Sequence, residues 1–251
     1  MDTLQYLPTK QGHKLAYRYS PGASLGVVFL AGFMSDMEGS KACFLEQACK
    51  KLGLSYLRFD YSGHGKSEGI FSEGTIGQWT KDTLAMIDQI TTGPQILIGS
   101  SMGGWIGLLA AKARRNRIKA FIGIAAAPDF TVRLWNRELS AAQKQEILQK
   151  GFVAIPTEYG DVPYIITDRF IKDGWENRVL HQPLNLDIPV RLLQGMEDKD
   201  VPWDTPMHIA KALGGKNVDI TLVPKANHSM SCDSDLARLE QTLQALVAKL
   251  R

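Results

Sequence analysis

An alternation of short aliphatic runs with longer amphipathic stretches constrains the fold of this sequence more than any other feature. Such an alternation is typical of a parallel sheet covered by helices. The aliphatic runs predict strands over residues 14–18, 26–31, 55–60, 95–99, 120–125, 190–194 and 219–223. The helical patterns predict helices over residues 40–52, 76–90, 102–114, 205–213 and 233–250. We therefore expect an α/β protein with a mostly parallel sheet flanked by helices.

The alternation breaks down between Pro128 and Leu186, where aromatic residues and polar helical patterns replace it. Connections longer than about 12 to 15 residues without structure of their own are uncommon in compact domains. We therefore expect a mostly helical cap at residues 128–186, inserted into a single domain that spans residues 1–251. Its aromatic side chains either line a substrate pocket or hold the cap on the body: Phe130, Trp135, Phe152, Tyr159, Tyr164, Phe170 and Trp175.

The charge pattern argues against a nucleic-acid partner. The formal net charge is only +3, and the basic residues are not gathered into the clusters that such a surface needs. The one basic run, from Lys112 to Lys119, follows a helical pattern, where cations favourably meet the negative end of the helix dipole. No stretch approaches the roughly 18 to 20 apolar residues that span a bilayer, so stable membrane insertion is not expected.

The cysteines and the N-terminal stretch bear on the cellular compartment. Cys43, Cys49 and Cys232 are odd in number and form no C-x-x-C arrangement, which argues against a disulfide framework and a zinc site. The first residues are polar and match neither a secretory signal nor an Arg-rich transit peptide. These features predict a cytoplasmic protein.

The segment from Gly99 to Gly103 carries the pattern G-x-S-x-G between a predicted strand and a predicted helix. A serine on a sharp strand-to-helix turn projects its hydroxyl above the sheet, and the residues two positions away must be small because backbones approach closely there. Ser101 is flanked in this way by two glycines, whereas Ser100 would be flanked by isoleucine and methionine. The pattern therefore favours Ser101 as a nucleophile.

An oxyanion hole is expected beside this serine. The backbone N–H of Met102 would lie at a helix N-terminus and point to the space where a tetrahedral oxyanion forms. The loop after the early strand carries Gly32 and Phe33, and the N–H of Phe33 is the candidate for the second donor. The alternative for this loop is an ordinary β-to-α turn that contains a glycine.

A serine nucleophile needs a histidine base, which in turn needs an acid to hold its tautomer. Of the five histidines, His228 alone lies in the loop between the last predicted strand and the last helix. Three acids follow the preceding strand: Glu197, Asp198 and Asp200. Asp198 is favoured because it lies midway between a glycine turn and an apolar anchor, while Asp200 is expected to stay solvated. The resulting order Ser, Asp, His is the one expected for this kind of fold.

These motifs resemble those of the α/β-hydrolase superfamily of serine hydrolases, over almost the whole chain apart from the cap. The stretch DYSGHGKS at residues 60–67 resembles the D-x-x-G-x-G-x-S loop of the superfamily, in which His64 is expected to be structural. Residues 29–69 and the stretch GMEDKDVPW are similar to the abhydrolase-domain group of palmitoyl-protein thioesterases and acyl-glucuronide esterases. Where many members carry histidine before the glycine of the oxyanion loop, this chain has Ala31.

The resemblance implies hydrolysis of carboxylic esters or thioesters of acyl groups, in small molecules or acyl-proteins, without metal or cofactor. Its triad would be Ser101, Asp198 and His228. Two alternatives stay open, because fold and triad do not fix the substrate. One is a peptidase or lipase-type hydrolase, and the other is a non-catalytic scaffold that binds a ligand or a partner protein. The sequence does not indicate an oligomeric state.

Overall fold

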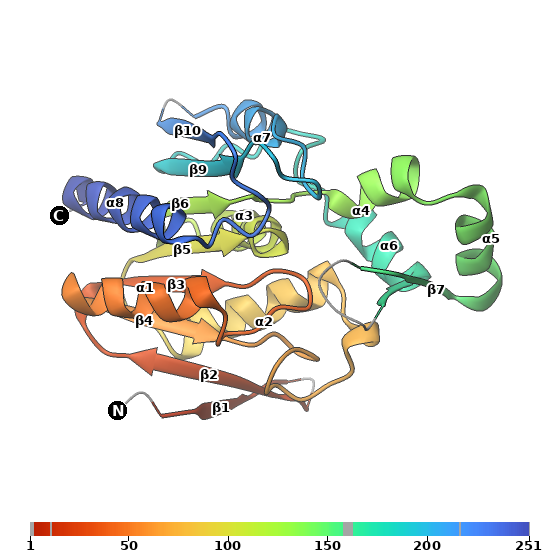
Figure 1. Ribbon diagram of the computed structural model, residues 1–251. Coiled ribbons are helices and arrows are strands. Elements are labelled where there is room, and N and C mark those ends of the chain that lie inside the picture. Colours follow the sequence, from red (N-terminus) through yellow and green to blue (C-terminus); the bar gives the residue numbers. More distant parts are fainter. Residues whose placement is uncertain (1–2, 11, 158–162, 216, 251) are drawn as a thin grey trace.

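The computed structural model of the chain describes residues 3–10, 12–157, 163–215 and 217–250. Its centre is an eight-stranded sheet in the order β1-β2-β4-β3-β5-β6-β9-β10 (Figure 1). The strands are β1 (Gln5–Pro8), β2 (Lys14–Ser20), β3 (Ala23–Leu30), β4 (Leu54–Phe59), β5 (Gln95–Ser100), β6 (Ile118–Ile124), β9 (Val190–Gly195) and β10 (Val218–Val223). The pairs β1/β2 and β2/β4 are antiparallel, and all other neighbours are parallel. The prediction of a mostly parallel sheet is confirmed.

Helices cover both faces of this sheet. In Figure 1, α1 (Ser40–Lys51) and α8 (Asp233–Leu250) lie in front of it, and α2 (Ile76–Gln89) and α3 (Met102–Ala113) lie behind it. α7 (Thr205–Leu213) packs against β9 and β10. Every residue of β4, β5 and β9 is buried, as expected for strands covered on both faces.

The edge strand β1 is absent from the sequence-based prediction. It has four residues, of which only Leu7 is buried, and it ends at a proline. A run this short shows no clear alternation of apolar and polar side chains, which is the signal by which a half-buried strand is found. β1 therefore owes its strand geometry to its antiparallel pairing with β2.

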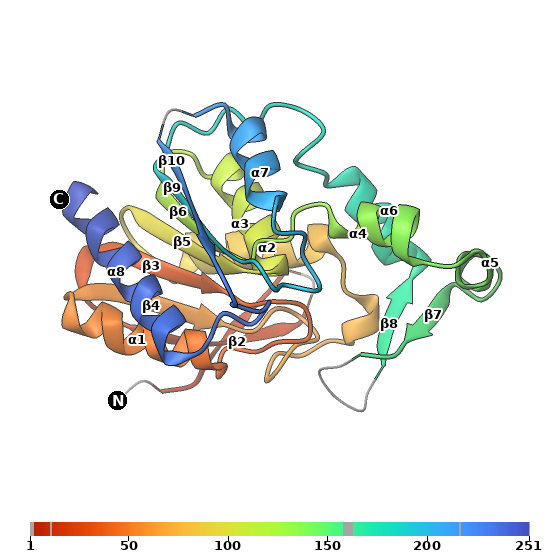
Figure 2. The same ribbon diagram turned by 45° about the horizontal axis from the view of Figure 1, so that its top comes forward.

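Among the described residues, six short elements lie between β6 and β9, and Figure 2 shows that they project beyond the carboxyl ends of the central strands. They are α4 (Phe130–Arg133), the π-helical turn η2 (Leu134–Glu138), α5 (Ala141–Lys150), β7 (Phe152–Ile155), β8 (Tyr164–Thr167) and α6 (Asp168–Glu176). The α/β fold with an inserted helical segment is confirmed, although the segment also contains the antiparallel pair β7/β8. A reciprocal capping box between Ser140 and Gln143 begins α5.

A single cluster of buried side chains runs from the central sheet into this segment, where it includes Ile147, Ile166 and Phe170. A continuous core is what distinguishes one domain with an insertion from two independent domains. We therefore propose that residues 1–251 form one domain and that residues 128–186 are an insertion within it.

Candidate active site

Ser101 lies in the sharp turn between β5 and α3. Its φ of 53° and ψ of −119° are unfavourable for a residue with a side chain. Neighbouring backbone holds this geometry, because the N–H of Ser101 donates to the carbonyl of Ile124 at 2.9 Å and its carbonyl accepts from the N–H of Ala127 at 3.0 Å. The turn thus raises the Ser101 side chain above the carboxyl end of the sheet.

Close backbone contacts explain the glycines on either side of this serine. A Cβ atom at Gly99 would lie 2.3 Å from the carbonyl oxygen of Gly103, and a Cβ atom at Gly103 would lie 2.1 Å from the carbonyl oxygen of Leu30. No side chain fits at either position. This spacing is centred on Ser101, whereas Ser100 is the last residue of β5 and is only 7% exposed.

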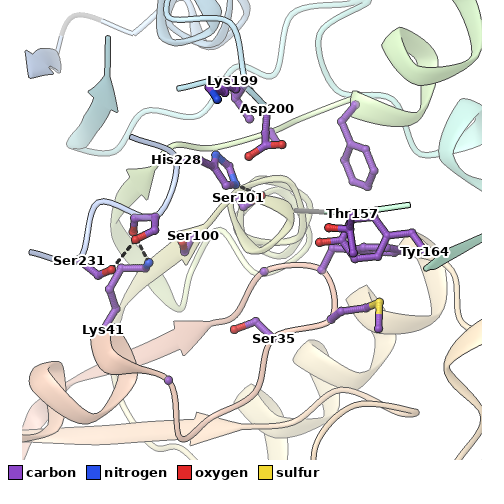
Figure 3. Close-up of a pocket in the computed structure, with 18 of the residues that line it drawn as sticks. Ser35, Lys41, Ser100, Ser101, Thr157, Tyr164, Lys199, Asp200, His228 and Ser231 are labelled. Atoms are coloured by element: carbon purple, nitrogen blue, oxygen red, sulfur yellow. Dashed lines mark hydrogen bonds between the residues drawn. The ribbon is translucent and has the colours of Figure 1, made fainter. Parts of the chain in front are cut away.

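The structure brings Ser101, Asp198 and His228 together from three separate turns. His228 follows β10, and its Nε2 atom lies 3.0 Å from Oγ of Ser101. Its Nδ1 atom lies 2.9 Å from Oδ2 of Asp198, which follows β9. Figure 3 shows the imidazole facing the serine across the floor of a pocket. The His228 side chain is 17% exposed, whereas the Asp198 side chain is fully buried.

Asp198 is held by the turn in which it lies. Its Oδ1 atom accepts the backbone N–H groups of Asp200 at 2.9 Å and Val201 at 2.8 Å. Burial raises the pKa of Asp198, but the hydrogen bond and charge of His228, with these two backbone N–H groups, outweigh burial and leave that pKa below its ordinary value. Asp198 is therefore a carboxylate at neutral pH.

The other two acids of this turn have different surroundings. Glu197 is exposed. Asp200 lines the pocket, and in Figure 3 its carboxylate faces the cavity, while its backbone carbonyl accepts a hydrogen bond from Arg133. Of the three acids in this turn, Asp198 is the one that bonds His228, and its role as the acid of a triad stays a prediction.

The backbone around the expected oxyanion hole comes close to the serine. A Cβ atom at Gly32 would lie 3.4 Å from Cβ of Ser101, so the loop that contains Phe33 touches the turn that carries Ser101. Met102 is the first residue of α3, which puts its N–H at the positive end of the helix dipole. The assignment of these two N–H groups as oxyanion donors stays a prediction.

A pocket of about 880 Å³ opens over Ser101 and His228. One side is apolar and is lined by Phe33, Phe130, Leu134, Ile155 and Tyr164. The other side is polar and is lined by Lys41, Ser229 and Ser231. In Figure 3, Lys41 and Ser231 lie on one side of Ser101, and Tyr164 and Thr157 lie on the other. A substrate whose reacting carbonyl lies at Ser101 would therefore extend in two chemically different directions.

On the polar side of the pocket, Lys41 forms a hydrogen bond with the loop that carries His228, here called the histidine loop. Its Nζ atom donates to the carbonyl of Ser229, the residue after His228, at 2.5 Å. Burial lowers the pKa of Lys41, and the charge of Asp235 partly opposes this shift. Lys41 thus links α1 to the loop that carries the imidazole.

The aromatic residues of the insertion were expected either to line a pocket or to hold the insertion on the body, and the structure shows both. Phe130 and Tyr164 line the pocket, while Phe170 is buried and its ring centroid lies 5.4 Å from that of Phe33. The half-buried or exposed members are Trp135, Trp175 and Phe152. Tyr159 lies outside the described residues. Both expectations therefore hold, but for different residues.

Three contributions were not foreseen from the sequence. The ring of Phe33 contacts Phe71 and Trp79 of the body and three aromatic rings of the insertion. Lys41 approaches the histidine loop, and Gln194 bonds Asp198. The sequence could have indicated Gln194, because a polar residue near the carboxyl end of a buried, mainly apolar strand needs a polar partner there.

Possible metal ligands occur at the same place. Within the part of the chain that the structure describes, Asp198, Asp200 and His228 have ligand atoms within 4.8 Å of one another. Asp198 and His228 already bond each other through two of these atoms. We therefore assign the group to hydrogen bonding, and the absence of a cofactor stays a prediction.

The fold and the arrangement of this site define an α/β hydrolase. Residues 24–168 match the family described as "Serine aminopeptidase, S33", and the chain belongs to this family. Over 249 residues, which are 99% of this chain and 81% of the relative, it is 40% identical to the palmitoyl-protein thioesterase ABHD10, mitochondrial, of Homo sapiens. The protein of the same name from Bos taurus matches with the same identity and coverage.

A solved structure shows the same likeness. The alpha/beta hydrolase domain-containing protein 10 from mouse superposes with a TM-score of 0.92 and 38% sequence identity, covering 99% of this chain and 100% of that chain. The resemblance to the abhydrolase-domain group, stated from the sequence, is confirmed.

The prediction of a cytoplasmic location is wrong, because these relatives are named as mitochondrial proteins. That prediction depended on unpaired cysteines and on a polar N-terminal stretch. Cys43, Cys49 and Cys232 are free thiols in the structure, but free thiols indicate only a reducing environment and do not distinguish one reducing compartment from another.

Hydropathy along the helices gives one further result. Among the helices of the described residues, none is both long enough and apolar enough to cross a membrane.

Proposed function

We propose that this α/β hydrolase is a serine hydrolase that cleaves esters or thioesters of acyl groups through an acyl-enzyme. One observation carries the proposal: an unbroken series of hydrogen-bonded atoms leads from Oδ2 of Asp198 through the imidazole of His228 to Oγ of Ser101, with separations of 2.9 and 3.0 Å. Both distances are suitable for proton transfer and for fixing the tautomer.

In the proposed reaction, the carboxylate of Asp198 accepts a hydrogen bond from Nδ1–H of His228, which keeps the proton on Nδ1 and leaves Nε2 free to take the proton of Ser101. The serine oxygen attacks the acyl carbonyl, and the N–H groups of Phe33 and Met102 stabilise the oxyanion. His228 then gives the proton to the leaving alcohol or thiol. A water molecule, activated by the same imidazole, releases the acid and restores the serine.

The apolar side of the pocket supports an acyl group as the part of the substrate that the insertion covers. Phe33, Phe130 and Tyr164 offer aromatic surface next to the reacting serine. A volume of about 880 Å³ suits a ligand with a substantial apolar part. The name of the relatives, palmitoyl-protein thioesterase, agrees with such a substrate. We propose an acyl-protein or a small acyl conjugate as the substrate, and the mitochondrial setting named for these relatives as its location.

The family description favours a second candidate, an aminopeptidase. Such an enzyme must bind the ammonium group of its substrate, and three acids line the pocket: Asp36, Glu138 and Asp200. Cleavage of an aminoacyl amide would distinguish this candidate, because an ester or thioester hydrolase has no need to bind a free ammonium group.

The test compares wild type with Ser101→Ala and Ser100→Ala on a palmitoyl thioester, an aryl ester and an aminoacyl anilide. We expect wild type to hydrolyse the thioester and the aryl ester but not the anilide. Ser101→Ala should lose about 10⁴-fold or more in kcat, as expected for a lost nucleophile, while Ser100→Ala stays within about threefold.

Each contrary outcome has its own meaning. Anilide cleavage that depends on Ser101 would favour the aminopeptidase. Turnover that survives Ser101→Ala would contradict the serine mechanism. A wild-type protein that binds these substrates without turnover would be a non-catalytic scaffold.

A further inference from the structure

Gln194 is a fully buried polar residue near the carboxyl end of β9. Its Nε2 atom donates to Oδ2 of Asp198 at 2.8 Å. The same oxygen atom bonds Nδ1 of His228 at 2.9 Å. Two donors, one from the sheet and one from the imidazole, therefore share one carboxylate oxygen.

The orientation of the Gln194 amide follows from its neighbours. Nε2 faces three oxygen acceptors: Oδ2 of Asp198 and the carbonyls of Gly195 at 3.3 Å and Val201 at 3.4 Å. A flipped amide would place its own oxygen against all three, which is repulsive because an ionised carboxylate only accepts hydrogen bonds. The amide hydrogen atoms must therefore point to Asp198.

This orientation leaves the other end of the amide unsatisfied. Oε1 of Gln194 is buried and has no hydrogen-bond partner among the described residues. A buried acceptor without a partner destabilises the folded state. An apolar side chain of similar length would have no unpaired acceptor but would also lose the donor to Asp198, so the bond to Asp198 is what the amide supplies at this position.

We propose that Gln194 is a positioning residue for the triad, which holds Oδ2 of Asp198 toward His228 and shares the charge of that oxygen. The inference rests on the proposed function. Sharing the charge weakens the attraction of the carboxylate for a protonated imidazole, so the base releases its proton more readily. Fixing the oxygen keeps the imidazole at its distance from Ser101.

Other charged groups face the pocket around His228, and they stay constant when Gln194 is changed. They come from α1, from the turns after β3 and β9, and from the start of the insertion: Lys41, Asp36, Lys199, Asp200, Arg133 and Glu138. A change in the pH profile on substitution of Gln194 therefore reports the bond to Asp198.

The test uses the variant Gln194→Met, which keeps the length of the side chain but removes its donor. Its matched control is Gln95→Met. Gln95 is also a buried glutamine of the central sheet, but it lies at the opposite end of its strand and donates to Thr92 and Gly93. Both variants and wild type are assayed for kcat, KM and the pH profile of kcat/KM on one thioester substrate.

We expect Gln194→Met to lower kcat by about tenfold with KM within about twofold, because a hydrogen bond to a charged catalytic group is lost. The acidic limb of the profile should move up by about half a pH unit, because the full carboxylate charge then acts on the imidazole. Gln95→Met should leave both unchanged. If Gln194→Met does not fold, Gln194→Glu replaces it; its acid donates to Asp198 only when protonated, so its activity should fall as the pH rises.

Wild-type kcat and an unmoved pH profile in Gln194→Met would overturn the inference, as would the same changes in Gln95→Met. Ser101→Ala in the same assay separates the two claims. If Ser101→Ala is inactive and Gln194→Met is not impaired, only the role of Gln194 fails; if Ser101→Ala is active, the proposed function fails.

Discussion

Asp198 and Asp200 lie two residues apart in one turn but differ in their relation to the imidazole. Asp198 bonds Nδ1 of His228, whereas Asp200 contributes its backbone N–H to Asp198 and turns its carboxylate to the pocket. Asp198→Asn keeps the shape of the side chain but removes the charge and no longer fixes the tautomer. We expect kcat/KM to fall by about 10³- to 10⁴-fold.

Asp200→Asn is the matched control for Asp198→Asn, because it removes a neighbouring carboxylate but keeps the backbone N–H that bonds Asp198. It should stay within about tenfold of wild type in steady-state kinetics. Equal losses in the two variants, with circular dichroism showing both folded, would mean that the acid has been assigned wrongly.

The burial of His64 predicts that the free energy of unfolding depends on pH. His64 is 3% exposed, and its ring lies among Tyr61, Phe71 and Trp79. Burial lowers the pKa of His64 to about 4, and a weak hydrogen bond to the carbonyl of Ser62 opposes this shift only in part. An unfolded histidine takes up a proton near pH 6.5. Between pH 6.5 and about 4 the unfolded state therefore binds more protons, and stability falls as the pH falls.

The effect of His64 is measured by urea unfolding of wild type and His64→Phe at about pH 7 and about pH 4.5. We expect wild type to lose about 2 to 3 kcal/mol more than the variant over this interval. Asp60, Asp82 and Asp129 have raised pKa values and also titrate in acid, but they are common to both proteins and cancel. Parallel losses in the two proteins would show that His64 is not held neutral.

At the scale of elements, Asp129 joins the two ends of the insertion. Its φ is 57°, and its carboxylate accepts the N–H groups of Val179 at 2.8 Å and Leu180 at 2.9 Å. Asp129→Ala removes both acceptors and puts alanine in a left-handed conformation. We expect a loss of about 2 to 4 kcal/mol in the free energy of unfolding, and faster proteolysis between residues 130 and 178.

Asp129→Asn is the control, because asparagine tolerates this backbone and keeps one acceptor oxygen. It should lose less than half as much stability as Asp129→Ala. An alanine variant as stable and as protease-resistant as wild type would contradict this role.

The strands β5 and β9 could be predicted from the sequence because each is a short run of buried, mainly aliphatic residues. Both begin at their predicted first residues, Gln95 and Val190, and end one residue later than predicted. The pair β7/β8 could not be predicted, because each strand has four residues and gains its hydrogen bonds only from the other. Secondary structure that depends on a distant partner leaves little local signal.

At the scale of the whole molecule, the site lies where the strand order changes direction. β3 lies between β4 and β5, and the turns after β3, β5, β9 and β10 meet at the carboxyl ends of the parallel strands, beneath the insertion (Figure 2). Such switch points are where open α/β sheets bind ligands.

The geometry of the sheet explains how much of the site could be predicted. Ser101, Asp198 and His228 each follow a strand that the sequence reveals, and parallel strands bring those ends to one edge. The pocket could not be predicted, because the ring of Phe33 meets Phe130, Tyr164 and Phe170 across more than ninety residues of sequence. Contacts of this kind depend on how the insertion packs, which chain order does not reveal.

The identity of the nucleophile is tested most directly by fragment-ion mass spectrometry after reaction with a fluorophosphonate. Trypsin releases Ser100 and Ser101 in one peptide, which runs from Asp82 to Lys112, and fragmentation between them locates the adduct. We expect the phosphonate on Ser101 in wild type, and no labelled peptide in Ser101→Ala or after prior incubation with an excess of thioester substrate. An adduct on Ser100 or on any other residue, with Ser101 unmodified in an active enzyme, would contradict the account.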